Sequence, residues 1–135
     1  MATLRDAERL FVGLPYVRET FDCMHLAVMV QADLFGRIVP WRQQRHPANA
    51  AERDRLIRQH AAALARRVDE PRTGDAALMW PAGMHDEGLH IGTVFVERGE
   101  RWVLHTSGGT GAVLQRLVDA QCLGLVVEGF YRWLE

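Results

Sequence analysis

The 135-residue chain lacks several features that would mark it as a specialised class of protein. It holds only two cysteines, Cys23 and Cys122, which stand 99 positions apart (122 − 23). One disulfide is possible, but this count excludes a disulfide-rich scaffold. No pair of Cys or His residues has the close spacing of a zinc site, so no metal is predicted. The net charge is −1, from 16 basic and 17 acidic residues, which argues against nucleic acid or an anionic membrane as partner.

Long apolar runs and repeats are also missing. No apolar stretch approaches the length of a membrane span, and the charged start at 1–6 does not have the pattern of a signal peptide. We therefore expect synthesis and folding in a bacterial cytoplasm. No repeat, low-complexity segment or linker interrupts the chain, and 48% of its residues are hydrophobic. One domain over residues 1–135 is predicted.

Apolar residues at three- and four-residue spacing predict three helices in the first half of the chain. The first covers 4–12 and is capped by Thr3, and the second runs from Asp22 to Gly36. The third begins at 47–49 and continues to about Asp69. Its Arg-rich face is predicted to be a solvated surface, with no residue of this helix belonging to a site.

The second half of the chain changes to an alternation of period two, which is typical of strands. Strands are predicted over 76–80, 89–97, 101–106, 112–116 and 123–133. The short turn at 98–100 makes a hairpin of the second and third of these strands. Helices followed by a run of strands predict an α+β fold, with the N-terminal helices packed on a C-terminal antiparallel sheet.

Cys23 is the first candidate for chemistry, because Asp22 is predicted to cap the helix that begins there. Free backbone N–H groups and the helix dipole favour negative charge at such a position. This environment predicts a thiol pKa lowered from about 8.5 into the range of roughly 3.5 to 7.5. The alternative is a buried cysteine that acts as a small hydrophobe, which is the interpretation we give to Cys122.

Two histidines could supply a base for this thiol, since His90 and His105 lie in the two strands of the predicted hairpin. Residues whose numbers sum to about 197 should face each other, so His105 falls within about two residues of the position opposite His90. A thiol enzyme needs one imidazole to take the thiol proton and a second polar group to orient it. The alternative is a pair of partly exposed strand histidines. His25 should point roughly 200° away from Cys23 around the helix, which excludes it as the base.

At these residues the chain resembles the NlpC-type cell-wall peptidases, a group of papain-like cysteine peptidases. The resemblance is to the branch found in phage tails and phage-derived particles, and it covers nearly the whole chain. The matching pieces, in family order, are Pro15-Tyr16, Asp22-Cys23, Gly36 to Pro40, Gly74-Asp75, Leu89-His90-Ile91-Gly92, Val103-Leu104-His105 and Glu128-Gly129-Phe130-Tyr131-Arg132.

The resemblance implies a papain-like NlpC fold with Cys23 as nucleophile, His90 as general base and then acid, and His105 as the residue that orients His90. The hydroxyl of Tyr16 would assist, and the backbone N–H of Cys23 would contribute to an oxyanion hole. The implied substrate is an amide of a peptidoglycan stem peptide, typically the one after γ-linked D-glutamate. No metal or organic cofactor is implied. The implied location is the virion tail, with other tail-tip proteins as partners.

The chain also departs from the family pattern. Met24 and His25 replace a common Ser-Gly pair and put bulk near the cleft, so both are candidates for contact with substrate. Trp41 is the best exposed aromatic candidate, and Ser107 is a candidate for the cleft wall. The helix over 47–69 lengthens the gap between the cysteine and the histidine, and as an insertion it could dock other proteins.

Two functions remain open at this point. The Cys-His-His set favours a peptidoglycan hydrolase, whereas the bulk after the cysteine and the long helix favour a structural tail component that keeps the fold. An acyltransferase of the permuted relatives is disfavoured, because there the histidine precedes the cysteine.

Overall fold

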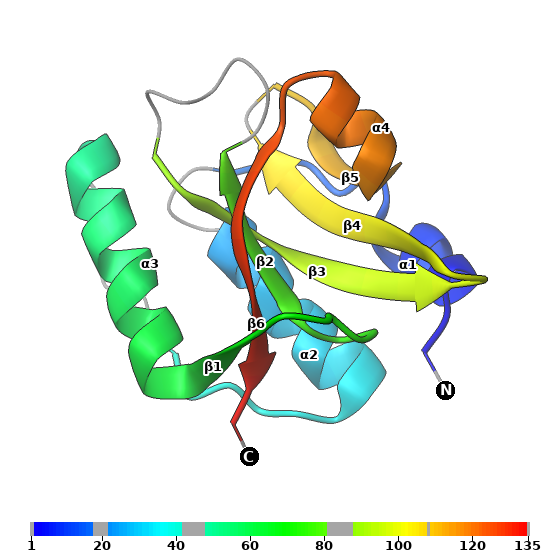
Figure 1. Cartoon of the computed structure of the whole chain (residues 1–135), viewed down its shortest axis with the longest axis horizontal. Helices are drawn as coiled ribbons and strands as arrows, with labels where there is room; N and C mark the ends of the chain where they lie inside the picture. The colour runs from blue at the N-terminus through cyan, green and yellow to red at the C-terminus, as the bar shows by residue number, and fades with distance from the viewer. Residues whose placement is uncertain (1, 18–21, 42–47, 81–87, 108, 135) are drawn as a thin grey trace.

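The computed structural model describes residues 2–17, 22–41, 48–80, 88–107 and 109–134, with the backbone alone at Ser107. These ranges contain four helices and one sheet of six antiparallel strands (Figure 1). The α+β class predicted from the sequence is confirmed. Predicted loop residues at 18–21, 42–44 and 81–87 and the predicted helix start at Pro47 lie outside the described residues, as does the side chain of Ser107.

The first two helices begin and end where their caps predict. In α1 (Leu4–Phe11), Thr3 and Asp6 form a capping box, in which each accepts from the other's backbone N–H. The second helix, α2 (Cys23–Phe35), begins after Asp22 and ends at Gly36. Gly36 has φ 63°, a left-handed conformation that glycine adopts without steric cost.

The third helix corrects the sequence prediction. Asn49 caps α3 (Ala50–Leu64), which ends well before Asp69. Residues 65–68 form strand β1 (Ala65–Val68) instead, paired with β6 (Val126–Trp133). The apolar residues on either side of this boundary have helical spacing, but the pairing with a distant strand overrides that local pattern. A fourth helix, α4 (Leu117–Cys122), was not predicted.

The sheet has the strand order β1-β6-β2-β3-β4-β5. Its remaining strands are β2 (Ala76–Trp80), β3 (His90–Glu97), β4 (Glu100–Ser107) and β5 (Gly111–Arg116). In the β3–β4 hairpin, Thr93 pairs with Leu104, so paired numbers sum to 197 (93 + 104), as predicted.

Helices cover both faces of the sheet (Figure 1). On one face, α1 and α2 pack against side chains of β3 and β4, such as Phe95 and Leu104. On the other face, α4 packs against Val94 and Val103. The start of α2 lies in a further cluster where Cys23 joins Ile57 of α3 and Ile91 of β3. The first residue of α2 is therefore enclosed by the sheet and α3.

Candidate active site

Cys23 is the first residue of α2, and its side chain is buried, with 2% exposed. Asp22 caps the helix as predicted. One carboxylate oxygen, Oδ1, accepts from the backbone N–H groups of Met24 at 3.0 Å and His25 at 3.2 Å. The same oxygen lies 2.9 Å from Nδ1 of His25, which in turn lies 3.2 Å from the backbone nitrogen of Asp22.

The predicted lowering of the Cys23 pKa is wrong for this structure. Burial and then the Asp22 carboxylate raise the pKa of the thiol to about 11, and these effects outweigh the opposing contributions of Arg53 and of backbone N–H groups at Ile91 and Met24. Two physical reasons account for the error. Removal from water disfavours the thiolate, and the negative charge of the Asp22 carboxylate, which caps the same helix, opposes a second negative charge at Cys23.

His90 is the first residue of β3, and it is 1% exposed. Its two sequence neighbours, Leu89 and Ile91, belong to the same cluster as Cys23. Strand alternation therefore directs the His90 ring toward the opposite face, on the side of Met79, with which it pairs in β2. Cys23 therefore lies on the side of β3 that Leu89 and Ile91 face, whereas the His90 ring faces the other side of the sheet at the same end of the strand.

In the β3–β4 register, the numbers of paired residues sum to 197, so position 107 of β4 lies opposite His90. His105 is two residues from that position, and side chains two residues apart on a strand share a face. His105 therefore lies on the same face as His90 without any bulge. Its Nε2 lies 2.7 Å from Oε1 of Gln115 on β5. With the amide oxygen as acceptor, Nε2 carries the proton and Nδ1 presents a lone pair. That is the form which can accept a hydrogen bond from a neighbouring imidazole, so Gln115 is a supporting residue that the sequence did not suggest.

Both histidines are held in the neutral form. Burial lowers the pKa of His90 to about 4, with further lowering by the charge of Arg53 and by His105. Burial also lowers the pKa of His105, against the opposing effect of the hydrogen bond that its Nε2 donates to Gln115. A neutral imidazole is the state that a general base requires.

Arg53 is the main feature of the site that the sequence interpretation missed. It belongs to the face of α3 predicted to be solvated, yet its side chain is buried, with 8% exposed. Its Nη1 lies 3.9 Å from Sγ of Cys23, and its guanidinium hydrogen-bonds the hydroxyl of Tyr16. Burial raises the pKa of Tyr16 and Arg53 partly offsets that rise. The structure thus brings Tyr16, which the resemblance placed near the thiol, together with Cys23, Asp22 and Arg53.

The predicted cleft candidates are mostly packed. Met24 is buried in the cluster around Cys23, which removes the bulk that we expected there. His25 is held by Asp22 and meets the ring of Trp41 edge-on at 4.9 Å. Trp41 is half-buried between His25 and His60 rather than exposed. Cys122, predicted to be buried, is exposed.

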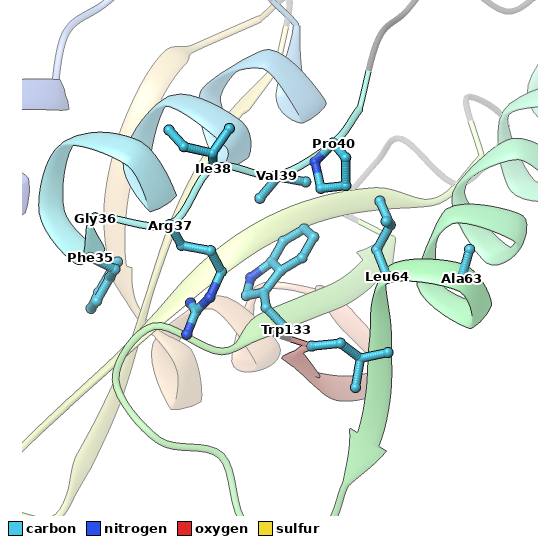
Figure 2. Close-up of a pocket in the computed structure, with 10 residues that line it drawn as sticks. Phe35, Gly36, Arg37, Ile38, Val39, Pro40, Ala63, Leu64 and Trp133 are labelled. Atoms are coloured by element: carbon cyan, nitrogen blue, oxygen red, sulfur yellow. The ribbon is translucent and has the colours of Figure 1, made fainter.

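One pocket lies at the far end of α2 from Cys23, and Figure 2 shows the residues that line it. It has a volume of about 550 Å³ and is formed by the segment 35–40, the end of α3, Trp133 and Leu134. These residues adjoin the last turn of α2, and a 13-residue helix separates that turn from Cys23 by roughly 18 Å. This pocket therefore does not serve the thiol.

Two further findings concern the described residues. Within the described ranges, no cluster of three His, Cys, Asp or Glu side chains could hold a metal ion. No helix in this part of the chain is long and apolar enough to cross a membrane.

In comparisons with known proteins, no family model, no curated protein and no solved structure matches this chain.

Proposed function

We propose that this protein is a thiol-dependent peptidoglycan hydrolase with a papain-like NlpC fold. One observation carries the proposal: Cys23 begins a helix that packs on β3, whose first residue is His90, and His105 follows on the paired strand. The order of these three residues along the chain, and the shared face of His90 and His105, support the Cys-His-His set that the resemblance implies. Asp22 is the helix cap and Tyr16 a neighbour of the thiol.

In the acylation step, His90 takes the Cys23 proton while sulfur attacks the amide carbon. The carbonyl oxygen becomes an oxyanion, stabilised by the backbone N–H of Cys23 and by the hydroxyl of Tyr16. As this intermediate collapses, the C–N bond breaks and His90 returns the proton to the leaving amine, which leaves a thioester. His105, on the same face of the sheet as His90, is the residue that the resemblance assigns to orienting the His90 ring.

Water then releases the acyl group. His90 removes a proton from water, the resulting hydroxide attacks the thioester carbon, and the C–S bond breaks. The departing thiolate recovers the proton from His90, which restores the neutral pair. Because the pKa of the thiol is about 11 and that of His90 about 4, neutral thiol and neutral imidazole are the resting state. Proton transfer therefore accompanies the attack.

The substrate class and location follow from the resemblance. The cleaved bond is an amide of the stem peptide, typically after γ-linked D-glutamate, and the protein acts at the tail tip of a phage or phage-derived particle. There it opens the cell wall beside other tail-tip proteins.

A second candidate is a structural tail component of the same fold with little or no hydrolysis. The burial of Cys23 and the raised pKa of its thiol favour this function, since both oppose thiolate formation.

Digestion of purified peptidoglycan separates the two candidates. The wild-type protein is expected to release new amino groups and fragments that end in γ-linked D-glutamate, detected by mass spectrometry. The Cys122→Ser variant should behave identically, because Cys122 is exposed at the end of α4 and has no role in the proposed mechanism. Folded protein that leaves the peptidoglycan unchanged would favour the structural role.

A further inference from the structure

Arg53 is a buried cation in contact with the candidate nucleophile. The sequence pattern predicts an exposed side chain at Arg53, Arg55 and Arg58. The structure exposes Arg55 and Arg58 but buries Arg53. The Nη1–Sγ distance of 3.9 Å places the guanidinium against the sulfur. A buried arginine loses its hydration and needs polar partners in its place. The Cys23 sulfur and the Tyr16 hydroxyl are two such partners of Arg53.

Its position is fixed by close packing of α3 on the start of β3. The carboxylate of Asp54, the next residue of α3, accepts from the backbone N–H of Leu89 at 2.5 Å. Gly88, at φ 85°, lies so close to α3 that a Cβ there would come within 2.7 Å of the Ala50 carbonyl oxygen. These contacts link Arg53 to the strand that begins at His90.

The charges around the sulfur give Arg53 a chemical role. The Asp22 carboxylate opposes a thiolate at Cys23, and Arg53 favours one. Burial lowers the pKa of Arg53, but Cys23, Tyr16 and Asp22 together leave it raised, so the guanidinium stays charged at any working pH. The same positive charge disfavours protonation of His90 and keeps it available as a base.

We propose that Arg53 is a catalytic residue, whose guanidinium stabilises the Cys23 thiolate as it forms and then the oxyanion of the tetrahedral intermediate. This inference rests on the proposed hydrolase function. Arg53 remains protonated throughout, and the thiol proton goes to His90 as described above. On this account α3 supplies part of the catalytic machinery, rather than serving solely as an inserted docking surface.

The test is the rate at which iodoacetamide alkylates Cys23 at pH 9, in a Cys122→Ser background that removes the exposed thiol. An opposite charge within about 4–6 Å shifts a pKa by roughly 1–3 units. Arg53→Gln should therefore slow alkylation about tenfold or more, since each unit reduces the thiolate fraction about tenfold. Arg53→Lys should stay within about threefold of the parent, because it keeps the charge. Arg55→Gln, which removes an exposed charge from the same helix, should have no effect.

A structural role predicts the opposite sign. If Arg53 only holds the fold together, its loss exposes Cys23 and alkylation becomes faster, approaching the rate in urea. A faster or unchanged rate in Arg53→Gln, or an equal slowing in Arg53→Lys, would overturn the proposal. Should Arg53→Gln fail to fold, Arg53→Lys decides: a retained rate supports the charge role, and an accelerated rate overturns it. Alkylation needs no hydrolysis, so inactivity on peptidoglycan would remove the proposed function without altering this result.

Discussion

Replacing Cys23 by alanine is expected to lower amide hydrolysis by roughly 10⁴-fold or more, because no other group can form the acyl intermediate. The substitution removes one sulfur atom from a site that is 2% exposed, next to Met24, Ile57 and Ile91. The small cavity should leave the chain folded at room temperature. Release of amino groups from purified peptidoglycan measures the loss, and a thermal melt verifies the fold.

The matched control is Cys122→Ser, which also removes a thiol but from an exposed position. It should retain the wild-type rate. Hydrolysis by Cys23→Ala at a rate close to that of the wild type would show that another residue carries the reaction.

Acidification from pH 7 to pH 4 is expected to remove about 3 kcal/mol of unfolding free energy through His90 alone. The pKa of His90 is lowered from 6.5 to about 4 in the folded protein. Between these values the unfolded chain binds the proton and the folded chain does not, so stability falls as the pH falls through this window. Below about pH 4 the folded state also binds the proton, and the contribution of His90 levels off.

Urea unfolding of the wild type and of His90→Gln at pH 7, 5.5 and 4 measures this effect. The variant lacks the titrating ring, so its stability should fall less steeply than that of the wild type. His105 has a lowered pKa and is present in both proteins, so its contribution cancels in the comparison. Equal slopes for the two proteins would show that His90 is not buried in the neutral form.

Local signals in the sequence were sufficient to predict the ends of α2 and the register of the β3–β4 hairpin. Asp22 and Gly36 predict both ends of α2, since a cap and a left-handed glycine act within one turn. The turn at 98–100 fixes the β3–β4 register, which places His90 and His105 on one face. The strand at 65–68 was missed because its pairing partner in β6 lies more than sixty residues further along the chain.

The electrostatics of the site depend on contacts that the sequence does not display. Arg53 lies in a run of charged residues typical of an exposed face, and its contact with Cys23 joins positions 30 residues apart. The pKa of Cys23 was predicted in the wrong direction for a related reason. A helix start favours a thiolate, but here burial and the charge of the Asp22 carboxylate that caps the helix outweigh that effect.

The most direct test of the account uses a substrate-shaped electrophile, the chloromethyl ketone of L-alanyl-γ-D-glutamate, with peptide mapping by mass spectrometry. If Cys23 is the nucleophile and His90 its base, the ketone should label Cys23 in preference to the exposed Cys122, and His90→Gln should slow this labelling by about 10²-fold or more. Labelling of Cys122 in place of Cys23, or a rate at Cys23 that does not depend on His90, would contradict the account.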